Sequence, residues 1–177
     1  MAKQIEGVSE KIIAAAKQEF LEKGYVDASL RTIASAAGTS TNSIYVRFGD
    51  KEGLFSAIVE PVLNEMVERF LKIQERFHQM SPDEQAAQMP EYSDSGTAEL
   101  VDCMYENLDE FRLLLDASYG TRFHNFVDEL VRIEVKYTYK YMETVGYPEK
   151  CGDALTEKLL HICLLYTSPS PRDSTSS

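Results

Sequence analysis

The chain has 177 residues, of which 44% are hydrophobic and 27% are charged. This composition is ordinary for a globular protein and allows a sizeable core, either in one domain or in two small ones. The sequence contains no apolar run of about 18 residues and no apolar signal region at its start, which excludes a membrane-spanning helix and predicts a cytoplasmic protein.

The net charge of −11 comes entirely from the later part of the chain. Residues 1–53 contain seven basic and seven acidic residues, whereas residues 54–177 contain eleven basic and twenty-two acidic residues. A protein that contacts DNA at one end needs positive charge at that end and not in total. The charge distribution therefore permits DNA binding by the N-terminal part without demonstrating it.

Helical periodicity dominates the first third of the chain. Apolar residues from Val8 to Phe20 recur at spacings of three and four, and Gly24 is expected to end this helix. Two short helices are expected next, each preceded by a capping serine and followed by a glycine: Leu30–Ala37 after Ser29, and Thr41–Phe48 after Ser40.

A long fourth helix is expected to begin after Asp50, which can cap it. Pro61 lies inside this helix and predicts a kink, because proline removes a backbone donor and clashes with the preceding turn. Ser81 begins a capping box for a short helix that is expected to fade near Pro90. Residues 91–96 are expected to form a loop.

The later part of the chain also has helical patterns. Four further helices are expected, over Thr97–Asn107, over Asp109–Ser118, from Gly120 to about Val145, and from near Gly152 onwards. Strand patterns are nearly absent, so the predicted fold class is all-α.

The last twelve residues, 166–177, differ from the rest of the chain. They are polar, rich in Ser and Pro and without periodicity, which predicts a disordered tail. They also interrupt an apolar helical pattern without a cap. The segment resembles translated adapter or vector sequence that follows an incomplete gene, and a natural flexible tail is the alternative.

The segment from Leu30 to Phe48 has the residue sizes that two closely packed short helices require. Ala34 is predicted to lie on the inner face, where a larger side chain would hold the helices apart, and Gly38 suits a positive φ at the turn. Three apolar residues are expected to form a small shared core: Ile33, Ala37 and Ile44. This spacing is typical of a helix-turn-helix, and a plain helical hairpin is the alternative.

A longer pattern extends this motif towards the C-terminus. It comprises Ile33-Ala34-Ser35-Ala36-Ala37-Gly38, then Ser40, Ser43-Ile44-Tyr45, Phe48, Lys51-Glu52 and Leu54-Phe55. With this pattern, residues 8–60 resemble the DNA-binding domain of the TetR family of transcriptional regulators. Thr39 and Gly53 depart from the residues usual in the family, and both are expected to loosen local packing slightly.

The resemblance implies a domain organisation. Residues 1–53 would form a three-helix helix-turn-helix DNA-binding domain, and residues 54–165 a helical ligand-binding and dimerisation domain that is incomplete because it is truncated at its C-terminus. Residues 166–177 would be the disordered tail, whether native or not.

The resemblance also implies a function. The protein would be a sequence-specific transcriptional regulator, namely a ligand-responsive repressor that binds palindromic operator DNA as a homodimer and responds to an unknown small-molecule effector. The alternative is a helical protein-interaction module that does not bind DNA.

The third predicted helix, Thr41–Phe48, carries small polar side chains at its N-terminus and can enter a DNA major groove, which is about 12 Å wide. Thr41 and Asn42 are predicted to contact bases, whereas Tyr45 and Arg47 are predicted to contact the DNA backbone. Three residues near helix N-termini are also predicted to contact phosphates: Ser29, Thr32 and Lys51. The alternatives are core packing for Tyr45 and simple solvation for Arg47 and Lys51.

Aromatic and sulphur-containing side chains crowd the second half of the chain. They form either plain core or the lining of a ligand cavity between helices. The candidates for a pocket lining are Phe70, Met104, Tyr105, Phe126 and Tyr137. The acidic excess of this half is a weak indication of a cationic or amphipathic effector.

Patterns typical of enzymes are missing from the sequence. The three histidines lie on different predicted helices, and the three cysteines are far apart with no CxxC pair. There is no glycine-rich phosphate loop and no GxSxG motif. We therefore expect no catalytic activity, no metal site and no cofactor.

Overall fold

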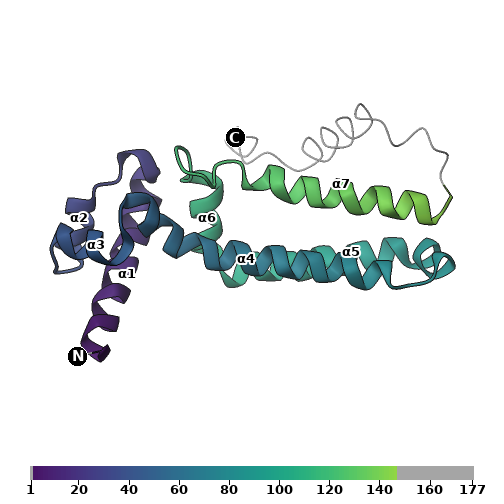
Figure 1. Ribbon diagram of the computed structural model, residues 1–177, viewed down its shortest axis with the longest axis horizontal. Coiled ribbons are helices and arrows are strands. Elements are labelled where there is room, and N and C mark those ends of the chain that lie inside the picture. The colour runs from purple at the N-terminus through teal and green to yellow at the C-terminus, as the bar shows by residue number, and fades with distance from the viewer. Residues whose placement is uncertain (1, 147–177) are drawn as a thin grey trace, which may run out of the picture. The chain divides into compact units, whose positions relative to one another are not determined.

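The computed structural model describes residues 2–146, and the predicted helix near Gly152 and the tail 166–177 lie outside them. Within the described residues the fold is all-α, as predicted, with no strand (Figure 1). The helices are α1 (Ala2–Asp27), α2 (Leu30–Ala36), α3 (Thr41–Phe48), α4 (Lys51–His78), α5 (Pro82–Glu106), α6 (Leu108–Asp116) and α7 (Phe126–Thr144). None of these helices has the length and apolar character that crossing a membrane requires.

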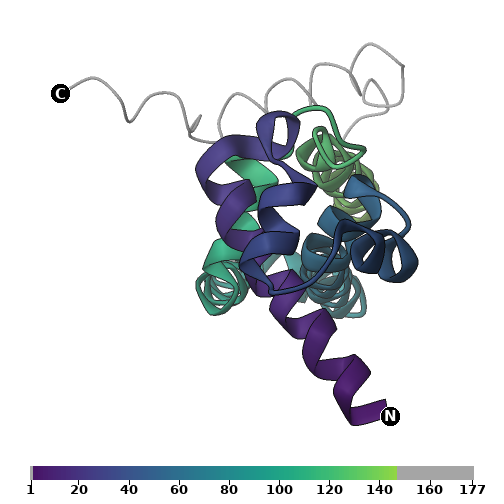
Figure 2. The same ribbon diagram turned by 90° about the vertical axis from the view of Figure 1, so that its left-hand side faces the viewer.

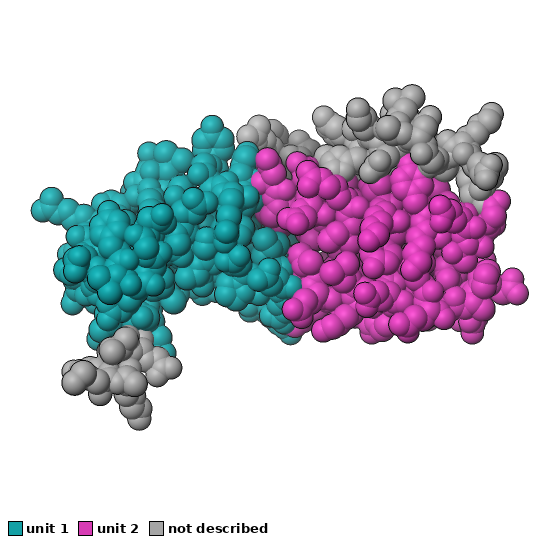
Figure 3. Space-filling view, viewed as in Figure 1, with its two compact units in different colours: residues 1–66, 103–124 teal, residues 67–102, 125–177 magenta. Residues whose placement is uncertain are grey.

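The chain forms two compact units, and each unit is assembled from two separate segments (Figure 3). Within the described residues, unit 1 comprises residues 2–66 and 103–124, and unit 2 comprises residues 67–102 and 125–146. The helices α4 and α5 therefore each contribute to both units. The predicted domain boundary after residue 53 stays a prediction.

The bounds of α2 and α3 agree with the prediction to within one residue, whereas α1 begins at Ala2 and not near Val8. Gly24 leaves the helical conformation with a φ of 73°, and only a short turn of α1 follows it. The side-chain oxygen of Ser29 accepts a hydrogen bond from the Thr32 amide, and that of Ser40 accepts one from the Ser43 amide. The predicted N-caps of α2 and α3 are thus confirmed.

The shared core of these helices is also confirmed. Helix α2 packs against both α1 and α3 (Figure 2). Ala34 is 3% exposed at this contact, and Gly38 has the positive φ of 64° that the turn requires. Three apolar side chains are buried between the helices: Ile33, Ala37 and Ile44. Full burial of an isoleucine side chain contributes roughly 1.5–3 kcal/mol to stability.

An aromatic cluster around Phe55 of α4 joins distant parts of unit 1. The centroid of the Phe55 ring lies 5.1 Å from that of Phe20, 5.5 Å from that of Tyr25 and 6.1 Å from that of Phe123. The amide of Tyr25 also donates a 3.0 Å hydrogen bond to the carbonyl of Ala117. Residues near 117–123 therefore belong to the same core as α1 and α4.

Helix α5 corrects one prediction. It runs without interruption through Pro90 and residues 91–96, which were expected to end a helix and form a loop. Packing within unit 2 explains the difference: the Tyr92 hydroxyl donates to the Ile73 carbonyl at 3.0 Å, and a Cβ on Gly96 would lie 2.9 Å from Cγ2 of Ile73. These contacts with α4 offset the roughly 3 kcal/mol by which proline disfavours a helix interior.

The start of α7 corrects another prediction. The last described helix begins at Phe126 and not directly after Gly120. In the intervening turn, the Thr121 hydroxyl donates to the Ser118 carbonyl at 2.7 Å, and Arg122 forms a 2.8 Å ion pair with Glu60. Burial of Phe123 against Phe55 and this ion pair hold the segment in turns.

The capping residues of α4 and α5 confirm their predicted roles. Asp50 accepts a 2.7 Å hydrogen bond from the Gly53 amide at the start of α4. Ser81 and Glu84 form a reciprocal capping box, in which the Glu84 carboxylate accepts from the Ser81 amide at 2.8 Å and the Ser81 hydroxyl accepts from the Glu84 amide at 3.4 Å. Helix α4 continues through Pro61, and the predicted kink stays a prediction.

Phe77 of α4 holds the three helical segments of unit 2 together. Its ring centroid lies 5.2 Å from that of Tyr92 on α5 and 5.6 Å from that of Tyr141 on α7. Next to it, the His78 ring stacks on Tyr137 of α7 with centroids 5.3 Å apart. Unit 2 is therefore built around aromatic contacts between α4, α5 and α7.

Gly53 lies at a close approach between the end of α3 and the first turn of α4. A Cβ on this residue would lie 1.9 Å from the carbonyl oxygen of Phe48. The sequence prediction that Gly53 loosens packing is therefore wrong, because the missing side chain is what allows the two helices to approach.

We predict that Gly53→Ala lowers the free energy of unfolding by about 1–3 kcal/mol, because the added methyl group forces the α3–α4 junction apart. Gly7→Ala is the matched control, since a Cβ there would meet no atom within 4 Å. The control should be neutral or stabilise the protein by up to about 1 kcal/mol through helix propensity. Urea unfolding measures both changes, and equal stability of the two variants would contradict the prediction.

Candidate nucleic-acid interface

Helix α3 has one buried face and one exposed face. Ile44 is fully buried against the core, whereas Asn42 is exposed, Tyr45 is 52% exposed and Val46 is 75% exposed. Residues 42, 45 and 46 are spaced by three and four, so they lie on the same side of the helix. The exposure of Tyr45 argues against core packing as its main role.

The segment that forms α2 and α3 contains no Asp or Glu of its own. Between Ser29 and Gly49 the sequence contains Arg31 and Arg47 and no Asp or Glu. Arg31 is exposed in the first turn of α2. The sequence prediction omitted it, although a cation at a helix N-terminus opposes the helix dipole and is informative for that reason.

Arg47 folds back along its own helix. Its Nη1 donates to the Ser43 hydroxyl at 2.6 Å and to the Ser43 carbonyl at 3.2 Å. Its Nε is buried without a hydrogen-bond partner among the described residues. The guanidinium group has five N–H donors, so these contacts hold the group at the end of α3 and leave donors for another acceptor.

Lys51 links the start of α4 to the end of α1. Its Nζ donates a 2.9 Å hydrogen bond to the Val26 carbonyl and lies 4.9 Å from the centroid of the Tyr25 ring. Burial lowers the pKa of Lys51, and the carboxylates of Asp27 and Glu19 oppose that shift. This contact with the C-terminal end of a helix explains a cation at this position without DNA, and the predicted phosphate contact stays a prediction.

The other predicted contact residues lie at the starts of α2 and α3. Thr32 is exposed and Thr41 is half-buried. Ser29 is the cap of α2, and its own amide donates to the Glu19 carboxylate at 3.0 Å. All seven predicted DNA-contact residues belong to unit 1, and four of them share α3.

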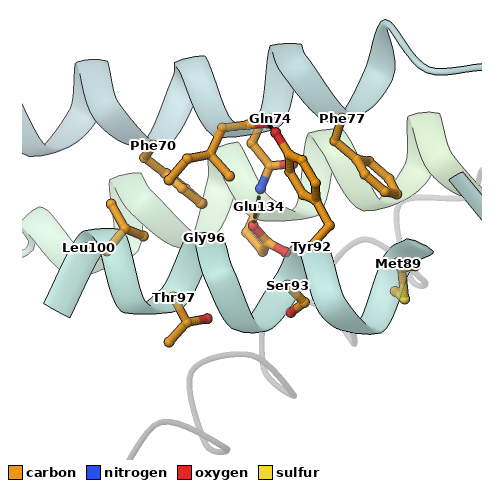
Figure 4. A pocket seen from close by; sticks show the side chains of 11 residues that line it. Phe70, Gln74, Phe77, Met89, Tyr92, Ser93, Gly96, Thr97, Leu100 and Glu134 are labelled. Atoms are coloured by element: carbon orange, nitrogen blue, oxygen red, sulfur yellow. Dashed lines mark hydrogen bonds between the residues drawn. The ribbon is translucent and has the colours of Figure 1, made fainter.

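A cavity of about 230 Å³ lies within unit 2 (Figure 4). Of the five predicted ligand-pocket residues, Phe70 lines this cavity. Phe126 and Tyr137 belong to unit 2 but do not line it, whereas Met104 and Tyr105 belong to unit 1, where Tyr105 is 72% exposed. The pocket role of these four residues therefore gains no support from the cavity.

The sequence prediction missed a charged residue in this cavity. Glu134 of α7 lines it together with Gln74 of α4. An indication was present in the sequence, because Glu134 is four residues after Leu130 and three before Tyr137 and thus lies on the apolar face of the helix. A carboxylate at such a position is partly withdrawn from water.

The capped α2 and α3, the glycine turn between them and the exposed polar side of α3 define a helix-turn-helix, which is a DNA-binding class of structure. A sequence profile described as "Bacterial regulatory proteins, tetR family" matches residues 12–58. Residues 12–58 are therefore similar to the N-terminal DNA-binding domain of the TetR family.

Three curated relatives each match about a third of the chain. The HTH-type transcriptional regulator YvdT of Bacillus subtilis is 38% identical over 69 residues, which are 39% of this chain and 36% of YvdT. BetI, a regulator of Stenotrophomonas maltophilia, is 41% identical over 59 residues, which are 33% of this chain and 30% of BetI. The repressor AcnR of Corynebacterium glutamicum is 37% identical over 59 residues, which are 33% of this chain and 31% of AcnR. The matched segment thus covers about a third of the length of each relative.

Among solved structures, NalD resembles the chain over most of its length. The crystal structure of this secondary repressor of the MexAB-OprM multidrug efflux pump in Pseudomonas aeruginosa shares 20% sequence identity with the chain. The similarity covers 93% of this chain and 81% of NalD, with a TM-score of 0.49.

We predict that Ser40→Ala destabilises the protein by about 1 kcal/mol, because it removes the side-chain acceptor that caps α3. Ser35→Ala is the matched control, since Ser35 is exposed within α2 and caps no helix. Thermal unfolding followed by circular dichroism measures both variants. A Ser40→Ala protein as stable as the control would show that the cap does not hold α3.

Proposed function

We propose that this protein is a DNA-binding transcriptional regulator, namely a repressor in the cytoplasm that binds operator DNA through α3. The observation that carries the proposal is the exposed side of α3, where polar and small apolar side chains project from a capped helix that contains no Asp or Glu. The names of the curated relatives, which are transcriptional regulators and a repressor, support a regulatory and non-enzymatic role.

Each exposed residue of α3 has a chemical role that a major groove can use. The Asn42 amide can form two hydrogen bonds with an adenine edge, and the Thr41 hydroxyl can bond to either a donor or an acceptor. Val46 can contact the methyl group of a thymine. Tyr45 and Arg47, further along the helix, would contact the phosphate backbone, and Ser29, Thr32 and Lys51 would add phosphate contacts.

We further propose that two copies bind a palindromic site together and that an effector controls the binding. A two-fold dimer would place its two α3 helices about 34–36 Å apart, which matches successive major grooves. Because α4 and α5 each contribute to both units, a ligand in unit 2 can act on unit 1 through continuous helices. The ligand must bind the DNA-bound and DNA-free states with different affinities, since otherwise neither state gains population.

The alternative, a protein-interaction module, predicts a different surface. A mainly apolar exposed face on α3 would favour this alternative, whereas α3 presents Asn42, Tyr45 and Arg47 around the single valine. The curated relatives lend no support to this alternative.

We predict that the protein selects a specific duplex from a random library and that its affinity falls steeply as salt concentration rises. Each phosphate contact should add about −0.9 to the slope of log K against log salt. Fluorescence anisotropy with the selected duplex measures this slope. Negligible binding to every duplex at low salt would refute the proposed function.

We predict that Arg47→Ala and Asn42→Ala weaken DNA binding in different ways. Arg47→Ala should lower the affinity for all duplexes and make the salt slope shallower by about 1, because it removes a phosphate contact. Asn42→Ala should change the base preference at one position of the site. The lost discrimination against the wrong base should be about 1–3 kcal/mol. Arg112→Ala is a matched control for the lost charge, because Arg112 is exposed on α6. Identical profiles for all three variants would contradict these roles.

A further inference from the structure

We propose that the unit 2 cavity binds a small lipophilic cation, with the Glu134 carboxylate as its counter-charge and aromatic rings as its walls. This inference names the chemical class of the effector. It rests on the proposed function only for the effect of the ligand on DNA binding, and not for the binding of the ligand itself.

The cavity combines apolar walls with one charged group. Its lining includes Phe70 and Phe77 from α4, and Tyr92 and Leu100 from α5. Figure 4 shows these side chains around the Gln74–Glu134 pair, which joins α4 and α7. Among the described residues that line the cavity, Glu134 alone carries a formal charge.

Glu134 has a neutral partner in a partly buried site. Its Oε2 accepts a 2.7 Å hydrogen bond from Nε2 of Gln74. Burial raises the pKa of Glu134, and the hydrogen bond from Gln74 opposes that shift. The amide of Gln74 stabilises the carboxylate but does not compensate its negative charge. A positive charge nearby stabilises a carboxylate that is partly withdrawn from water.

Aromatic rings strengthen the preference for a cation. The face of an aromatic ring attracts a positive charge within about 6 Å of its centroid, and the attraction grows when water is excluded. Phe70, Phe77 and Tyr92 provide three such rings in the cavity wall. An anion would be repelled by Glu134, and a neutral ligand would leave the carboxylate without compensation.

The cavity volume indicates the size of the group that the pocket can hold. A protein cavity of about 150 Å³ holds one benzene molecule. The volume of about 230 Å³ therefore suits one aromatic ring with a compact cationic group, such as phenyltrimethylammonium.

Isothermal titration calorimetry on the full chain tests this inference with two ligands of the same shape. Phenyltrimethylammonium carries a positive charge, whereas tert-butylbenzene is its neutral isostere. We expect the wild-type protein to bind the cation at least tenfold more tightly than the neutral ligand. Equal affinities, or no binding of the cation, would overturn the proposal.

Three substitutions on α7 test whether Glu134 is the counter-charge. Glu134→Gln should weaken cation binding at least tenfold while tert-butylbenzene binds as well as before, which also reports an intact cavity. Glu129→Gln is the matched control, because it removes the same charge from an exposed position of the same helix and does not line the cavity. Glu134→Asp, which keeps the charge, should retain most of the preference for the cation. If both Gln variants bind the cation equally, Glu134 is not the counter-charge.

A separate measurement distinguishes this inference from the proposed function. The selected duplex is bound to the protein, and phenyltrimethylammonium is added while anisotropy is followed. Release of DNA by the wild type and not by Glu134→Gln supports both proposals. Cation binding that depends on Glu134 but leaves DNA binding unchanged supports the pocket and overturns the effector role alone.

Discussion

The contact of Phe55 with Phe20, Tyr25 and Phe123 is the constraint on which the N-terminal unit depends. It joins the start of α4 to the end of α1 and to the segment that follows α6. The end of α3 lies against Gly53, which is in the same first turns of α4 as Phe55. The packing of Phe55 therefore also sets where α3 lies relative to α1. The Lys51 bond to the Val26 carbonyl reinforces this junction. The position of the exposed helix α3 thus depends on packing among residues that lie outside it.

The parts of the fold that depend on neighbouring residues were predictable from the sequence. Ser29, Ser40 and Asp50 cap helices through atoms three residues away, so their roles can be recognised locally. The continuous α5 was not predictable in this way, because its passage through Pro90 depends on contacts between Tyr92 or Gly96 and α4. The late start of α7 likewise depends on the packing of Phe123 against a residue far away in the sequence.

In the candidate sites, too, local features were predictable from the sequence and features that depend on distant residues were not. Helical spacing predicts which residues of α3 face outward, and Asn42 and Tyr45 are exposed in the structure, in agreement with that spacing. The internal bonds of Arg47 and Lys51 were not predicted, since a sequence does not show which acceptor a long flexible cation finds first. Glu134 was missed because surface carboxylates are common, and only its neighbours on α4 and α5 distinguish it from them.

The central claim is that the exposed side of α3 is the surface that meets DNA. Titration of the ¹⁵N-labelled protein with a selected duplex, followed by amide NMR spectra, tests this claim most directly. The account predicts that the largest chemical-shift changes fall on residues 40–48 and on the start of α2, whereas amides of α7 change little. Unchanged signals from α3 while another surface responds to the duplex would contradict the account.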